Sequence, residues 1–191
     1  MRNVSIPCIG TGFGVLRWIS KRTNITDLHG NRLVRVTADS SITATITAPI
    51  GFAGNWEGWW CSDYGSNDHF YIIDFKSFMF TATGYSLIMN TSNYHKSFKL
   101  YGSDDKYNWT LVKEFLFPTE PTSERQYIQF DYSIMKRYYK IFTNDTRYDA
   151  LTSLSIESLD FYGNILWDYG YTCKKRIRRS LNLFFLQFCL I

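Results

Sequence analysis

Short runs typical of β-strands, separated by turn sequences, occupy most of this chain and limit the folds open to it. Each run is rich in aromatic and β-branched residues, and the segments between them are rich in Gly, Asp, Asn, Ser and Pro. The pattern predicts strands at 32–37, 70–75, 78–89, 97–101, 109–115, 126–132, 138–143 and 154–162. Short strands with almost no helical periodicity predict an all-β fold, an antiparallel sandwich or barrel.

The last predicted strand has an irregular apolar pattern. Leu154 and Ile156 share one parity, whereas Leu159 and Phe161 share the other. Successive side chains of a strand point to opposite faces, so both pairs can face the core only if the strand is interrupted. We expect a β-bulge near 157–158.

One short helix is expected ahead of the strands. In residues 14–21, the apolar positions between Val15 and Ile19 lie close to i, i+3, i+4 spacing. The preceding Gly-Thr-Gly-Phe-Gly sequence (10–14) starts like a dinucleotide-binding loop. However, Val15 stands where that motif needs its third glycine, and no βαβ pattern follows. We interpret 10–14 as a flexible entry segment.

The positive charge of the chain is concentrated near its C-terminus. The formal net charge is +4, and five basic residues lie within residues 174–179. They are Lys174, Lys175, Arg176, Arg178 and Arg179. Without them the chain has 16 basic and 17 acidic residues. The remaining body therefore lacks the basic surface that binds a phosphate backbone, which argues against nucleic acid as a partner.

The segment that follows this basic cluster, 181–191, is mostly apolar. It is too short to span a bilayer, which takes about 20 apolar residues. Basic residues beside an apolar stretch fit an anionic membrane surface, so contact of the tail with such a surface is one hypothesis. The alternatives are that the tail packs on the domain, binds a partner, or is an artefact of where the reading frame was called.

Cysteines and glycosylation sequons bear on the cellular location. The four cysteines show no C-x-x-C pair and no metal-ligand spacing. The N-terminal apolar run is interrupted by Pro7 and three glycines, which makes a poor signal peptide. Five sequons favour secretion instead, at Asn3, Asn24, Asn90, Asn108 and Asn144. We expect a cytoplasmic location rather than secretion, with peripheral membrane association through the tail.

Residues able to carry catalysis form no recognisable motif. Neither the three histidines, His29, His69 and His95, nor any serine stands in a known catalytic pattern. We interpret His69 as a turn residue at a strand start. Cys61 follows two tryptophans and is interpreted as a small buried apolar residue. We therefore expect neither an enzyme nor a cofactor.

Two clusters of oxygen-bearing side chains are the only candidates for a metal. One is Asp63, Asn67 and Asp68, and the other is Asp104-Asp105. Neither follows the calcium-loop pattern of an EF-hand. We interpret both as solvated turn carboxylates, with a structural calcium as the alternative.

Aromatic residues gather in a glycine-rich segment, 50–66. Large aromatic side chains on loops at the end of a sandwich can stack on a ligand or insert into a membrane. Phe52 and Trp56 are flanked by small or polar residues and are the candidates for exposure. Trp59 or Trp60 is expected to fold back into the core.

Several of these runs also carry the motifs of a known family. Residues 85–87 (YSL), 97–105 (SFKLYGSDD) and 108–111 (NWTL) resemble, in order and spacing, the signature of discoidin-like domains. These are also known as coagulation factor 5/8 type C domains, of the galactose-binding-like superfamily. Residues 71–75 (YIIDF), 138–141 (YYKI) and 156–163 (IESLDFYG) match further strands of that family. The resemblance covers about residues 30–164.

The resemblance implies an eight-stranded antiparallel jelly-roll sandwich with ligands at loops of one end. It divides the chain into a lead-in with a short helix (1–29), the sandwich (30–164) and the basic and hydrophobic tail (165–191). Phe98 and Asp104 depart mildly from the family's usual Trp and Asn. Secreted relatives join the ends of the domain by a disulfide; Cys8 and Cys173 flank this domain, but each lies well outside the position of that disulfide, so a Cys8–Cys173 bridge is only an alternative. The His and Arg set of the sugar-binding relatives does not align with this chain.

The sequence thus favours a non-catalytic recognition module that binds another protein through loops at one end. The alternative is a carbohydrate- or phospholipid-binding module at the cell surface or outside the cell. From the expected strand ends, the ligand-binding candidates are Phe52, Trp56, Asn93, His95, Arg147 and Asp149.

Overall fold

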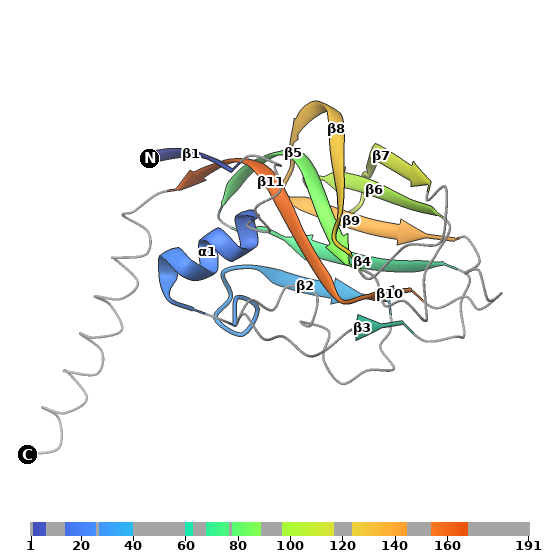
Figure 1. Ribbon diagram of the computed structural model, residues 1–191, viewed down its shortest axis with the longest axis horizontal. Helices are drawn as coiled ribbons and strands as arrows, with labels where there is room; N and C mark the ends of the chain where they lie inside the picture. Colours follow the sequence, from blue (N-terminus) through green and yellow to red (C-terminus); the bar gives the residue numbers. More distant parts are fainter. Residues whose placement is uncertain are drawn as a thin grey trace, which may run out of the picture.

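The computed structural model describes residues 2–6, 14–25, 27–39, 60–62, 68–76, 78–88, 97–116, 124–144 and 154–167. One helix and eleven strands lie within these ranges (Figure 1). In chain order they are β1 (Arg2–Ile6), α1 (Val15–Thr23), β2 (Arg35–Ala38), β3 (Trp60–Cys61), β4 (His69–Asp74), β5 (Met79–Ile88), β6 (Ser97–Ser103), β7 (Thr110–Leu116), β8 (Gln126–Met135), β9 (Tyr138–Thr143), β10 (Ser155–Ile156) and β11 (Ser158–Trp167).

The strands form two main antiparallel sheets. Sheet A has the order β1-β11-β5-β8, and sheet B has the order β2-β4-β9-β6-β7. A third, two-stranded sheet pairs β10 with β3. The expected all-β sandwich with one short N-terminal helix is therefore confirmed.

The strand count differs from the expected eight in three places. β1 and β3 had no recognised strand pattern, and the single run expected at 154–162 is divided into β10 and β11. In that run the apolar residues change from one parity to the other because β10 ends at Ile156 and β11 begins at Ser158. The prediction of a bulge there is therefore wrong. The register of β11 against β5 shifts instead between Tyr162 and Gly163, where the extra residue is Thr83 of β5. β1 and the end of β11 lie outside the 30–164 limits expected for the sandwich.

Aromatic side chains from both sheets form the centre of the core. Phe75, Phe80, Tyr139 and Phe161 are completely buried. Phe75 and Phe80 have ring centroids 4.8 Å apart, and Tyr139 and Phe161 have centroids 5.2 Å apart. Burying four large rings removes several hundred Å² of apolar surface from water, the main stabilising contribution to a fold of this kind. Part of the high aromatic content of the sequence is thus located in the core.

The sandwich has two distinct ends. At the first, short connections join β4 to β5, β6 to β7 and β8 to β9, so we call it the turn end. At the other, which we call the loop end, lie His69, Ile88, Ser97 and Thr143 at the strand termini. From β2 onward, the longer connections between strands (β2–β3, β5–β6, β7–β8 and β9–β10) leave from the loop end.

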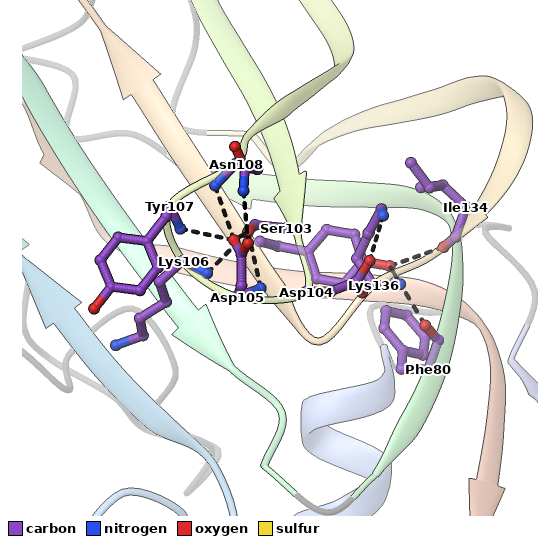
Figure 2. A network of polar contacts seen from close by, with 10 residues as sticks. Phe80, Ser103, Asp104, Asp105, Lys106, Tyr107, Asn108, Ile134 and Lys136 are labelled. Atoms are coloured by element: carbon purple, nitrogen blue, oxygen red, sulfur yellow. Dashed lines mark hydrogen bonds and ion pairs between the residues drawn. The ribbon is translucent and has the colours of Figure 1, made fainter.

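The β6–β7 turn is organised by one carboxylate (Figure 2). Asp105 accepts hydrogen bonds from the backbone N–H groups of Tyr107 and Asn108, from the Asn108 side chain at 2.7 Å and from the Ser103 hydroxyl. The bonds from Asn108 are the main reason that the pKa of Asp105 lies well below its usual range. The Gly-Ser-Asp-Asp and Asn-Trp motifs of the family resemblance therefore build a turn.

Helix α1 is fixed to sheet A by a buried carboxylate of β11. Gly14 is the N-cap of the helix and has no side chain to cap it. Asp160 supplies the missing acceptor: its carboxylate accepts the backbone N–H groups of Gly14 (2.9 Å), Leu16 (2.9 Å) and Arg17 (3.4 Å). A helix N-terminus attracts negative charge. The place where a dinucleotide loop would hold phosphate is thus taken by this side chain.

The ionisation of Asp160 should make stability depend on pH. Burial raises its pKa from 3.8 to about 6, although the backbone N–H bonds act in the opposite direction. The folded state therefore binds the proton more tightly than the unfolded state. The resulting stabilisation should be fully present below pH 3.8 and lost as the pH rises to about 6, a change of about 3 kcal/mol.

This expectation is checked by denaturant unfolding of the wild type and Asp160→Asn between about pH 4 and pH 7. The difference in free energy of unfolding, wild type minus variant, should increase as the pH falls. A decrease would mean that the N–H bonds to the carboxylate outweigh its burial.

Within the residues that the structure describes, no helix is long and apolar enough to cross a membrane. The tail and its basic residues lie outside the described residues, so its contact with a membrane surface remains a prediction.

Candidate functional site

The ligand-binding residues expected from the sequence all lie outside the described residues. They fall in three segments: 52–56, 93–95 and 147–149. The strand termini that flank these segments are described, and they lie at the loop end: Asp39 after β2, Ile88 in β5 and Asn144 after β9. The strand ends therefore point to the loop end as the place for a ligand, and the six named residues remain predictions.

A buried histidine and a carboxylate form a pair at this end. His69 begins β4 and is completely buried. Its Nδ1 lies 2.8 Å from Asp39 Oδ2, and the other oxygen of Asp39 accepts the Phe70 backbone N–H at 3.2 Å. Because a carboxylate only accepts hydrogen bonds, Nδ1 is the protonated nitrogen facing it. Asp39 thus fixes the orientation of the imidazole ring.

The second ring nitrogen of His69 is left without a partner. Nε2 is buried and makes no hydrogen bond with the residues that the structure describes. Buried polar atoms are nearly always hydrogen-bonded, because an unpaired one costs about 1–3 kcal/mol. Because the ring is fully buried, a ligand hydroxyl reaches Nε2 only if binding uncovers this oriented, unsatisfied nitrogen at the loop end.

The sequence interpretation of His69 as a turn residue is wrong. The residue is part of a ladder, opposite Thr143 of β9, and its side chain is inaccessible to water. Its partner Asp39 is 30 residues away in the chain, so no local motif could have joined the two. The one available signal was the position of His69 directly before an apolar strand.

The structure also describes several other residues that the sequence offered for catalysis or metal binding. The carboxylate of Asp104 pairs with Lys136, and that of Asp105 organises the turn described above (Figure 2). Asp68 is exposed. Cys61 is buried, as expected from the sequence, and its thiol donates to the Ser62 carbonyl oxygen at 3.4 Å. Among the described residues, no three His, Cys, Asp or Glu side chains gather closely enough to hold a metal ion.

A separate apolar surface follows one edge of the sandwich. Within the described ranges, large apolar side chains are exposed only on β7, on β8 and in the turn before β7. They are Tyr107, Leu111, Leu116, Tyr127, Tyr132 and Met135. β7 ends sheet B and β8 ends sheet A, and Tyr132 Oη donates to the Leu111 carbonyl 3.4 Å away. We call this surface the β7–β8 edge.

No family model matches the sequence, and no curated protein does. Solved structures do match. Chitosan-binding module 1, from a chitosanase/glucanase of Paenibacillus sp. IK-5, is 20% identical with a TM-score of 0.56; the match covers 69% of this chain and 96% of that one. The family 32 carbohydrate-binding module of NanJ from C. perfringens, solved with galactose, is 17% identical with a TM-score of 0.56, covering 69% and 94%.

A third similar structure is the family 32 module of AlyQ in complex with 4,5-unsaturated mannuronic acid. It is 19% identical with a TM-score of 0.53, and the match covers 70% of this chain and 94% of that one. Each match spans nearly the whole of the other module. The chain therefore has the discoidin-like, galactose-binding-like fold that the sequence motifs implied.

Proposed function

We propose that this protein is a non-catalytic carbohydrate-binding module with its sugar site at the loop end, next to His69. The observation that carries the proposal is the similarity of the fold to carbohydrate-binding modules solved with sugars. The His69 ring, oriented by Asp39 at the loop end and unpaired at Nε2, is the candidate contact: a sugar hydroxyl can satisfy this nitrogen once binding uncovers it. No cofactor enters the proposal.

Similar structures support carbohydrate over protein as the ligand. Their titles name chitosan, galactose and 4,5-unsaturated mannuronic acid. The sequence favoured a protein partner first and a carbohydrate second, and we reverse that order here. The reason is that sequence motifs specify the strands and turns of this fold, whereas the ligand depends on the loops between them.

The test is a thermal-shift screen of the full chain against galactose, chitosan oligomers and mannuronate oligomers. A sugar that binds only the folded state should raise the melting temperature, by an amount equivalent to about 2.7 kcal/mol at a hundred times its Kd. If none of these sugars shifts the melting temperature, the proposal fails in this form.

The variant His69→Asn locates the site. The asparagine amide can still donate to Asp39 from near the position of Nδ1, but it places no atom at Nε2. We expect a loss of sugar affinity of more than about tenfold, measured by calorimetry, with the fold retained. The matched control is Tyr107→Ser at the turn end, where the side chain is 87% exposed and binding should not change. Unchanged affinity in His69→Asn would remove His69 from the site.

A protein partner is the second candidate, and the β7–β8 edge favours it. Exposed apolar side chains grouped along one edge of a domain can mark an interaction surface, and Leu111 and Tyr132 are in contact here. Substituting Leu111 and Tyr132 by Ser should abolish such an interaction and leave sugar binding intact. The two candidate functions can therefore be tested separately.

A further inference from the structure

The centre of the outer face of sheet B holds a lysine. Lys140 lies on β9, the middle strand of the sheet, directly opposite Ile72 of β4 and Tyr101 of β6. Its neighbours in the strand, Tyr139 and Ile141, face the core and are buried. The alternation of the strand therefore directs Lys140 outward.

Three aromatic rings surround the Lys140 ammonium group. Its Nζ lies 4.4 Å from the ring centroid of Trp109, 5.1 Å from that of Tyr101 and 5.6 Å from that of Phe142. These separations are within the range of cation–π attraction. All four side chains are partly exposed, so they form part of the surface. We call this group the Lys140 cluster.

Lys140 differs from the other lysines of sheet B in having no acidic partner. Lys99 pairs with Glu114 at 3.7 Å, and Lys113 pairs with Asp131 at 2.8 Å. No carboxylate lies within ion-pair distance of Lys140 among the residues that the structure describes. The rings hold the ammonium in place but accept none of its N–H groups in a conventional hydrogen bond, so these donors remain available to an anion.

The partial burial of Lys140 also indicates that its ammonium group can bind an anion. It lowers the pKa of Lys140, which means that the positive charge is poorly solvated where it stands. A bound anion would compensate this charge more effectively than water does at a half-buried position.

We propose that the Lys140 cluster binds an acidic pyranose sugar, with the anionic group on the Lys140 ammonium and the sugar ring against Tyr101 and Trp109. Sugar rings present apolar C–H faces that pack on aromatic rings, and the cluster provides such rings beside one uncompensated positive charge. This site is on a different surface from His69 and does not depend on the function proposed for the loop end.

An acidic peptide is less suited to this face. Peptides that bind to sheets usually gain affinity by pairing their backbone with an exposed strand edge. β9 is paired with β4 on one side and β6 on the other, so its backbone groups are already occupied. A peptide would have only its side chains to offer here.

The experiment measures binding to the full chain by calorimetry at low salt. The probes are tetragalacturonate, a sulfated galactose oligomer, neutral galactotetraose and octaglutamate. We expect at least one acidic sugar to bind about tenfold more tightly than the neutral one, with an affinity that falls as salt is raised. The two acidic sugars distinguish a carboxylate from a sulfate as the preferred anionic group.

Lys140→Gln should weaken acidic-sugar binding by about tenfold, and Lys140→Arg should restore most of it. Lys99→Gln is the matched control: it removes a neighbouring charge that is already paired and should change the affinity by no more than about threefold. Melting temperatures show that each variant is folded. His69→Asn should leave this binding unchanged, which separates the site from the one at the loop end.

Three results would overturn the proposal. They are acidic sugars that bind no better than galactotetraose, a Lys140→Gln protein that binds them as tightly as the wild type, and octaglutamate that binds as tightly as the sugars. The last of these would identify the cluster as a site for acidic protein segments.

Discussion

Replacing Gly14 with alanine should lower the free energy of unfolding by about 3 kcal/mol, which corresponds to a fall of roughly 10 °C in melting temperature for a chain of this length. A Cβ at Gly14 would overlap the carboxyl carbon and both oxygens of Asp160. That carboxylate is buried and held by backbone N–H groups, including its own neighbour Phe161 at 2.8 Å. It cannot move aside without losing these bonds.

A double-mutant cycle tests this mechanism. Asp160→Ala should cost about 3 kcal/mol or more, because it leaves the N–H groups at the start of α1 unpaired in a buried place. In that background the added methyl of Gly14→Ala meets no carboxylate, so the second substitution should cost almost nothing. The coupling energy between the two sites should therefore be about 3 kcal/mol. Additive effects would show that Gly14 is sensitive for another reason, such as helix propensity.

The Gly163→Ala protein should lose about 4 kcal/mol or more, and a large part of it should be insoluble on expression. Gly163 has a φ of +143°, which L-residues with a side chain rarely adopt. A Cβ there would also overlap the Thr81 carbonyl oxygen and lie 3.0 Å from the Ala82 Cα across the bulge. Both obstacles are backbone atoms of the paired strand β5, so no side-chain rearrangement can relieve them.

Gly102→Ala is the control for this prediction. A Cβ at Gly102 would lie 2.7 Å from Cγ of Lys136, a flexible side chain that can turn away. We expect this substitution to cost about 1 kcal/mol. Denaturant unfolding at one pH compares the two variants, and equal losses would show that the bulge is not specially constrained.

The apolar pattern of the sequence was sufficient to predict most of the sandwich. Each of the eight predicted runs overlaps a strand, because alternating or continuous apolar residues reflect burial against a second sheet, although only the second half of the run 32–37 lies in β2. The pattern failed where pairing depends on distant residues. β1 is a strand because it pairs with β11, and the two-residue β3 is a strand because it pairs with β10. β1 shows only a brief alternation, with Val4 and Ile6 on one parity, and the two residues of β3 are too few to show any.

The candidate sites were harder to predict for the same reason. His69 and Asp39 meet only through the pairing of β2 with β4. The Lys140 cluster draws on β9, on β6 and on Trp109 directly before β7. The motif residues Tyr101 and Trp109 were recognised as marks of a family, but their convergence on Lys140 follows from strand register. The six loop residues predicted to bind a ligand were placed from the expected strand ends alone, and they lie outside the described residues.

The pairing of β1 with β11 has a consequence for how this domain can be attached to other structures. Arg2 lies opposite Trp167, so the described chain enters and leaves side by side at the turn end (Figure 1). A linker or anchor joined at either position would hold the domain by the same pole and direct the loop end away from the attachment. The sandwich could equally be spliced into a surface loop of a host protein without forcing that loop apart, since its entry and exit points are neighbours.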